Sequence, residues 1–205
     1  NPLGTPVSID EAEDYIFGMV LFNDWSARDI QSWEYVPLGP FLAKSFASSV
    51  SAWVVSMDAL EPFRVEGPVQ DPKPLPYLQF KGTHNYDIEL EVLLETPRFN
   101  AARIVHSNYK YMYWNMVQQL THQASNGCNI QVGDLYASGT ISGPIRDSYG
   151  SMMELTWRGT EPLKLPNNTE RKFIQDNDTV IMKAYAKNEK VRIGFGEVIT
   201  TILPA

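Results

Sequence analysis

Apolar and polar residues alternate in one stretch near the middle of the chain. Every even position from Tyr86 to Leu94 is apolar, and Asp87, Glu89 and Glu91 stand between them. Side chains of a strand point alternately to opposite faces, so this period predicts a strand with one buried and one solvated face.

The period changes to helical spacing further along the chain. The apolar positions that recur every three or four residues are Tyr109, Met112, Tyr113, Met116, Val117, Leu120 and Ala124. Ser107 is a candidate N-cap for this helix, and Gly127 suits a left-handed residue at its end. The pattern therefore predicts a helix over residues 109–124.

Two shorter elements are expected before the alternating strand. Ser8 and Glu11 have the spacing of a capping box, which predicts a helix over residues 9–15. The apolar run Phe17–Phe22 is typical of a strand buried on both faces, and residues 52–57 form another strand-like run. Five prolines within residues 61–77 exclude a helix or a central strand there.

The last third of the chain consists of short β-like runs separated by turn residues. These runs are Asp134–Ser138, Ser151–Trp157, Arg171–Ile174, Thr179–Ala186 and Arg192–Leu203. Strands without regular alternation with helices predict an α+β fold with a sheet-dominated core and a few helices.

Charge and cysteine content narrow the class of protein. Lys and Arg number 17 against 24 Asp and Glu, a net charge of −7, which argues against nucleic acid as a partner. The longest apolar runs fall far short of the ~18 residues that a membrane span needs, so no membrane partner is expected. Cys128 is the single cysteine and cannot form an internal disulfide, which favours a reducing, cytoplasmic compartment.

Candidate chemistry in this sequence rests on carboxylates. The three histidines and Cys128 share no metal-ligand spacing, and no nucleophile elbow, phosphate loop or dinucleotide fingerprint occurs. Hard cations such as Mg²⁺ and Ca²⁺ prefer oxygen ligands. Glu89 and Glu91 could share an ion, although a solvated strand face is the favoured interpretation. Asp24 is the stronger candidate because it follows an apolar strand.

Several long sequence motifs resemble those of a known protein family. Residues 23–29 read Asn-Asp-Trp-Ser-Ala-Arg-Asp, which resembles the Asn-Asp-x-Ser-Ala-Arg-Asp signature of the fumarylacetoacetate hydrolase superfamily. The likeness continues through residues 33–46, 110–122, 126–129 and 133–144 and covers essentially the whole chain in order. It corresponds to the C-terminal half of the family's chain. Residues 1–205 are therefore expected to be the C-terminal portion of one catalytic domain whose remainder lies upstream.

The resemblance implies an activity. The family cleaves a carbon–carbon bond of 4-fumarylacetoacetate to give fumarate and acetoacetate, the last step of tyrosine breakdown. It implies a mixed β-roll, a homodimer and a divalent ion, Mg²⁺ or Ca²⁺, that stabilises the leaving enolate as a Lewis acid. Two rivals stay open. One is another diketo-acid hydrolase, decarboxylase or isomerase of the superfamily, and the other is a binding protein without catalysis.

The metal residues implied by the match are few. Asp24 matches a metal ligand, and Lys44 and Ser48 fall where the family places a lysine and a hydroxyl residue near a Mg²⁺-type site. Ser48 stands where threonine is usual. The family's Glu-x-Glu ligands and its catalytic histidine precede the signature, which makes Glu89 and Glu91 a decoy. Residues 1–205 alone are expected to be inactive.

The resemblance also implies roles around the substrate. Arg28, Gln31 and Lys44 match positions that stabilise developing negative charge. Glu154 matches the acid that orients the upstream histidine. Substrate contacts are assigned to Gln31, Tyr35 and Thr140.

Overall fold

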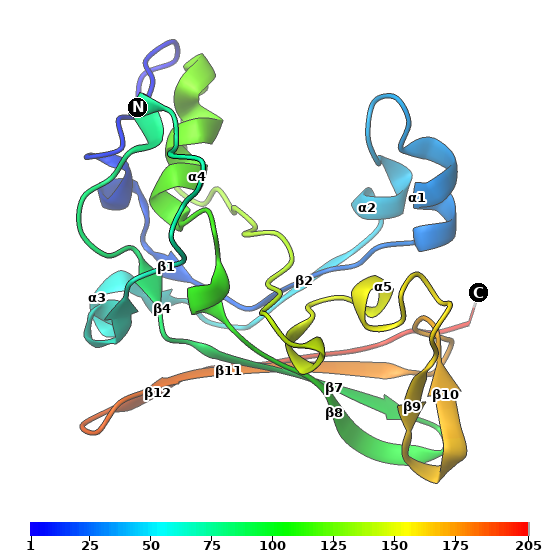
Figure 1. The fold of residues 1–205 in the computed structure, drawn as a ribbon. Coiled ribbons are helices and arrows are strands. Elements are labelled where there is room, and N and C mark those ends of the chain that lie inside the picture. The colour runs from blue at the N-terminus through cyan, green and yellow to red at the C-terminus, as the bar shows by residue number, and fades with distance from the viewer. Residues whose placement is uncertain (205) are drawn as a thin grey trace.

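The computed structural model describes residues 1–204, and its largest element is a four-stranded antiparallel sheet (Figure 1). The strand order is β12–β11–β7–β8. The bounds are Glu89–Thr96 for β7, Phe99–Asn108 for β8, Thr179–Lys187 for β11 and Arg192–Thr201 for β12. The strands expected over 86–94, 179–186 and 192–203 are thereby confirmed to within a few residues, whereas β8 was not predicted.

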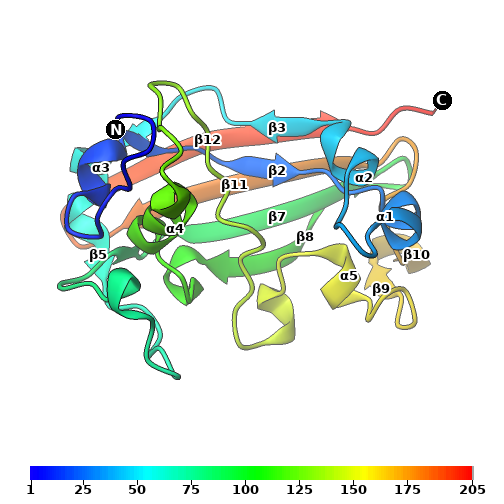
Figure 2. The same cartoon turned by 90° about the horizontal axis from the view of Figure 1, so that it is seen from above.

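A second layer of short strands covers one face of this sheet. β1 (Gly18–Met19) pairs with β4 (Val55–Ser56), and β2 (Phe22–Asp24) pairs with β3 (Ser48–Val50). β2 and β3 lie above the sheet in Figure 1 and run along it in Figure 2. The main core fills the space between the layers and includes Leu21, Val55, Leu60, Phe63, Tyr86, Ile88, Tyr109, Ala186, Phe195 and Val198.

Helices are short and lie around the sheet. The α-helices are α1 (Arg28–Glu34), α2 (Leu42–Ser45), α3 (Met57–Leu60), α4 (Met116–Gln123) and α5 (Met152–Leu155). Turns of 3₁₀ helix are η1 (Ala12–Tyr15), η2 (Glu61–Phe63), η3 (Pro76–Leu78), η4 (Tyr109–Tyr111), η5 (Ala124–Asn126), η6 (Arg146–Ser148) and η7 (Pro166–Asn168). Two further two-stranded sheets pair β5 (Arg64–Val65) with β6 (Asn85–Tyr86) and β9 (Leu163–Leu165) with β10 (Thr169–Arg171). The fold is therefore the expected sheet-dominated α+β class.

No helix among residues 1–204 has both the length and the apolar character needed to cross a membrane.

The N-terminal expectations need correction. The helix expected over residues 9–15 is a single 3₁₀ turn, η1. The Ser8 hydroxyl donates to the Glu11 carboxylate at 2.6 Å instead of accepting a backbone N–H, so the capping box does not extend the helix. The strand expected over 17–22 is split into β1 and β2, and Phe17 is 78% exposed instead of buried.

The helix expected over 109–124 is also shorter than predicted. Ser107 lies inside β8, and the chain makes the turn η4 before α4 begins. Asn115 is the actual N-cap, and its side chain and that of Gln118 each accept a hydrogen bond from the other's backbone N–H. Gly127 does adopt the expected left-handed conformation, with φ +79°.

Four predicted strands differ from the structure. Residues 52–57 contain β4 and then turn into α3, whose N-cap Ser56 accepts the N–H of Ala59. Residues 151–157 contain α5 instead of a strand. Residues 134–138 form no regular element, and β10 ends at Arg171, where the strand 171–174 was expected to begin.

A buried ion pair fixes β10 to the end of the main sheet. Arg171 donates from Nε and Nη2 to the two oxygens of Asp178 at 2.7 and 2.8 Å. The Asp178 side chain is fully buried, and its Oδ2 also accepts the N–H of Gln175 at 3.0 Å. The hydrogen bonds from Arg171 to the Asp178 carboxylate raise the pKa of the guanidinium.

Replacing Asp178 by asparagine is expected to lower the free energy of unfolding by about 3 kcal/mol, because an amide leaves the buried guanidinium without its counter-charge. Urea unfolding measures this. Asp176, which is exposed, supplies the control, and Asp176→Asn should stay within about 0.5 kcal/mol of the parent. If the two variants lose equal amounts of unfolding free energy, the stabilising role assigned to the Asp178–Arg171 pair is contradicted.

Candidate active site

The end of β2 positions the first candidate residues. Trp25 is buried against Leu94 and Val180 of the main sheet, and its indole N–H donates to the Ser49 hydroxyl at 3.0 Å. Neighbouring side chains of an extended segment point in opposite directions, so Asp24 is turned away from the core and is exposed.

Asp24 meets two of the predicted residues. Ser48 is its cross-strand partner in the β2–β3 pair. Lys44, carried by α2, donates from Nζ to Asp24 Oδ2 at 2.5 Å. The structure thus brings together the three residues that the resemblance places at or near a metal site. The Asp24–Lys44 pair is partly exposed, so it contributes only about 0–1 kcal/mol to stability.

Arg28 and Gln31 lie together on α1, which follows β2 directly. Arg28 Nη1 donates to Gln31 Oε1 at 2.8 Å, and both residues are half-buried. Asp24 lies outside this helix, because it ends β2 before α1 begins. Tyr35 is 52% exposed at the C-terminus of α1.

Glu154 lies on α5 between two serine hydroxyls. Ser142 donates to its Oε1 and Ser151 donates to its Oε2, each at 2.8 Å. Both oxygens of the carboxylate are therefore fixed in place. Thr140 is exposed two residues before Ser142 in the same loop.

The two serines were not predicted as site residues. Ser151 precedes Glu154 by three positions, the Ser-x-x-Glu pattern of a helix N-terminus, and this was the signal in the sequence. Ser142 gave no local signal, because its contact with Glu154 spans 12 positions.

The α1–α2 hairpin and α5 lie at the same end of the sheet, as Figures 1 and 2 show from two directions. Within residues 1–204, no hydrogen bond or ion pair joins Glu154 to Asp24, Arg28 or Lys44. The structure therefore holds two groups of candidate residues, one on the hairpin and one on α5.

Comparison with known proteins identifies the family. Residues 2–203 match the model of the fumarylacetoacetate (FAA) hydrolase C-terminal family. The chain belongs to the fumarylacetoacetate hydrolase family. It is 57% identical over 206 residues to the fumarylacetoacetases of Bos taurus and Homo sapiens, covering 100% of this chain and 49% of each relative.

The fumarylacetoacetase of Dictyostelium discoideum is 56% identical over 206 residues, covering 99% of this chain and 48% of the relative. The chain spans about half the length of the curated relatives it matches.

Within this member of the fumarylacetoacetate hydrolase family, residues 1–204 do not form a complete divalent-cation site. They contain no group of three or more His, Cys, Asp or Glu placed to hold an ion. Asp24 offers one carboxylate, which the Lys44 ammonium already occupies. Glu89 accepts a hydrogen bond from His106 at 2.8 Å, and Glu91 accepts one from Arg103 at 3.3 Å. Both carboxylates are therefore paired with side chains of the neighbouring strand β8.

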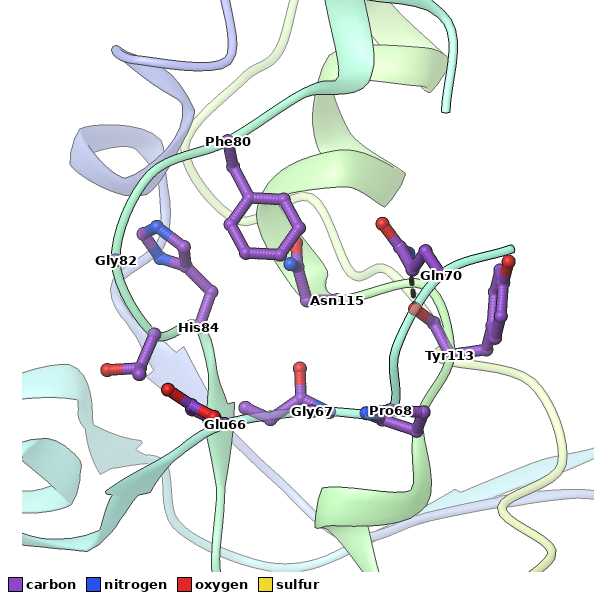
Figure 3. A pocket seen from close by; sticks show the side chains of 11 residues that line it. Glu66, Gly67, Pro68, Gln70, Phe80, Gly82, His84, Tyr113 and Asn115 are labelled. Atoms are coloured by element: carbon purple, nitrogen blue, oxygen red, sulfur yellow. Dashed lines mark hydrogen bonds between the residues drawn. The ribbon is translucent and has the colours of Figure 1, made fainter. Parts of the chain in front are cut away.

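A cavity lies away from both groups. It has a volume of about 200 Å³ and lies near β5, β6 and the start of α4. Figure 3 shows Glu66, Gln70, His84 and Asn115 around it. None of the predicted site residues lines this cavity.

Glu34 was not predicted as a site residue, yet it fixes the shape of the hairpin. Its carboxylate accepts the backbone N–H groups of Phe41 and Ala43 at 2.8 Å and of Leu42 at 3.2 Å. These bonds, the one from Ala43 first, lower the pKa of Glu34 below its ordinary value of 4.5. The only earlier signal was its place in the motif over residues 33–46.

The hairpin is therefore expected to loosen in acid. A carboxyl group whose pKa is lowered by folding stabilises the fold above its unfolded pKa, and this contribution disappears as pH falls through the folded pKa. Amide exchange protection at Phe41 and Ala43 should be constant above pH ~4.5 and fall below it. Glu34→Gln should remove this pH dependence. A parent protein with constant protection down to pH ~2 would contradict the prediction.

Proposed function

We propose that this chain is the C-terminal portion of the catalytic domain of a hydrolase that cleaves 4-fumarylacetoacetate to fumarate and acetoacetate. The carrying observation is the 57% identity to fumarylacetoacetases along the whole chain. The reaction would serve tyrosine and phenylalanine breakdown in the cytoplasm. The protein extended to the length of its relatives is called the full-length protein below.

The hairpin residues have the chemistry that this cleavage needs. Water adds to one ketone, and the bond between that carbonyl carbon and the methylene beside the other ketone breaks. The methylene fragment leaves as an enolate, so negative charge develops on a carbonyl oxygen. Preorganised donors stabilise such charge strongly when they point to where it develops. Arg28, Gln31 and Lys44 supply donors on two neighbouring helices. Tyr35 and Thr140 are exposed hydroxyl groups for the distal parts of the substrate.

Glu154 is proposed to hold the general base. Water attacks a ketone slowly without a base, and a histidine base needs a partner that fixes its ring and balances its charge. The two serine hydroxyls fix both oxygens of Glu154, which prepares the carboxylate for this role. The histidine itself would come from the part of the full-length protein that precedes these residues.

Asp24 is proposed as one ligand of a divalent cation, Mg²⁺ or Ca²⁺, whose other carboxylates lie outside residues 1–204. Both ions take six or more oxygen ligands, so one carboxylate needs others. Ser48, opposite Asp24, offers a hydroxyl oxygen. Lys44 cannot bind a cation, because an ammonium group only donates hydrogen bonds. Lys44 is therefore proposed to lie beside the cation and not to bind it.

A homodimer is also proposed. The hairpin exposes large apolar side chains, which in soluble proteins are commonly covered by another segment or subunit. The exposed set comprises Trp33, Tyr35, Val36, Leu38, Phe41, Leu42 and Phe46. Sedimentation equilibrium of the full-length protein tests the dimer, and a monomer at micromolar concentration would contradict it.

Product analysis separates the proposal from its rivals. The full-length protein is incubated with 4-fumarylacetoacetate and Mg²⁺, and the products are quantified by chromatography. Fumarate and acetoacetate in equal amounts support the hydrolase. Release of CO₂ indicates a decarboxylase, and an uncleaved isomer indicates an isomerase. Unchanged substrate indicates either a hydrolase of another diketo acid or a binding protein.

A further inference from the structure

The α1–α2 hairpin is closed by one carboxylate at its far end. Glu34 is the last residue of α1, and its Oε1 accepts the N–H groups of Phe41 and Ala43 while Oε2 accepts that of Leu42. These three amides form the N-terminal turn of α2, where backbone N–H groups lack partners within the helix. Glu34 therefore caps a helix to which it does not belong.

The near end of the hairpin is closed by a backbone bond. The N–H of Ala27, just before α1, donates to the carbonyl of Ala43 at 3.0 Å. Ala43 is fully buried. It is thus bonded through its N–H to Glu34 and through its carbonyl to Ala27. Lys44 is the next residue, and its ammonium reaches Asp24 at 2.5 Å.

Apart from the buried Ala43, side-chain burial does little to hold α2 in place. The helix is four residues long, and helices this short are unstable by themselves. Phe41 is 56% and Leu42 is 69% exposed, so their side chains add little burial. The position of Lys44 therefore depends on the bonds made at Ala43 and its two predecessors.

We infer that Glu34 is a positioning residue, which holds Lys44 against Asp24 and at a fixed spacing from Arg28 and Gln31 on α1. The effect of Glu34 on catalysis rests on the proposed function. The effect of Glu34 on the position of Lys44 is independent of that function, because it follows from the contacts within residues 24–44.

Chemical labelling tests the placement without any assay of activity. The full-length protein is treated with trace acetic anhydride, and mass spectrometry gives the acetylation rate of each lysine. Glu34→Ala should raise the rate at Lys44 severalfold and leave Lys164 and Lys190 unchanged. Glu95→Gln is the matched control, since Glu95 is an exposed carboxylate on β7. An unchanged rate at Lys44 in the alanine variant overturns the inference.

A double-mutant cycle tests the catalytic consequence. In the full-length protein, Glu34→Ala should lower kcat for 4-fumarylacetoacetate by about 100-fold with little change in KM, the effect of misplacing a catalytic group by about 1 Å. Added to Lys44→Met, it should lower kcat less than about twofold further, because its effect passes through Lys44. If the fold losses in kcat of the two single variants multiply in the double variant, the inference is overturned.

Glu34→Gln is a conservative variant that keeps the test usable if Glu34→Ala does not fold. Glutamine at position 34 keeps an oxygen that accepts from Phe41 and Ala43 but faces Leu42 with an amide donor. Glu34→Gln should therefore have a kcat between parent and Glu34→Ala, and it replaces the alanine variant in the cycle if that variant does not fold. A glutamine variant as impaired as the alanine variant contradicts the geometry. If the parent protein does not cleave the substrate, the proposed function fails and labelling alone decides the inference.

Discussion

Replacing Glu154 by glutamine in the full-length protein is expected to lower kcat by about ten-thousandfold, the scale seen when the acid that orients a catalytic histidine loses its charge. Glutamine has one acceptor oxygen, whereas Ser142 and Ser151 each donate to a separate oxygen of Glu154. One serine therefore loses its acceptor, and the charge that balances a protonated base is lost. KM should change little, because the interaction is made mainly in the transition state.

Steady-state kinetics across the pH range measure this effect. Glu170→Gln is the control, since Glu170 is an exposed carboxylate on β10. It should keep the parent kcat. A Glu154→Gln enzyme with the parent kcat at every pH would remove Glu154 from the mechanism.

Replacing Asp24 by alanine should abolish turnover through loss of the cation. Removing groups that merely support a ligand costs 10–100-fold in metal affinity, so loss of a ligand should cost at least about 100-fold. Isothermal titration of Mg²⁺ or Ca²⁺ into the metal-free full-length protein measures this. Unchanged affinity would contradict the assignment of Asp24 as a ligand.

Two controls separate the ligand from its neighbours. Asp29→Asn changes a carboxylate of the same motif whose one hydrogen-bond donor among residues 1–204 is the N–H of Ile30, and it should leave the affinity unchanged. Lys44→Met removes the ammonium that occupies Asp24, so it should keep or raise the affinity while lowering kcat.

The long strands could be predicted because their inner faces are uniformly apolar. β7 and β11 pair in register over seven positions, and the alternation survives in the sequence. β8 escaped prediction because register shifts beside Val92 and Leu94 interrupt the pairing with β7. Alternation along Phe99–Asn108 is correspondingly weak.

The errors at helices have local causes. Aromatic residues at helical spacing extended the predicted helix back to Tyr109, but Asn115 caps α4 and starts it later. Conversely, the apolar residues after Ser151 suggested a strand, although the Ser-x-x-Glu pattern already indicated the start of α5. In both places the capping residue, and not the apolar spacing, decides the structure.

The candidate site was predicted through the family motifs and not through local patterns. Asp24, Lys44 and Ser48 lie together only because β2 and β3 pair and the hairpin between them folds back. No spacing in the sequence indicates this contact. The role of Glu34 was equally hidden, because its bonds reach seven to nine positions along the chain.

One comparison of rates tests the central claim most directly. The full-length protein and residues 1–205 alone are each supplied with Mg²⁺ or Ca²⁺, and loss of 4-fumarylacetoacetate absorbance is followed. We predict turnover by the full-length protein and none by residues 1–205, which carry Asp24 and Glu154 but not the base and the other carboxylates that the proposal places upstream. Turnover by residues 1–205 near the full-length rate, or none by the full-length protein, would contradict the account.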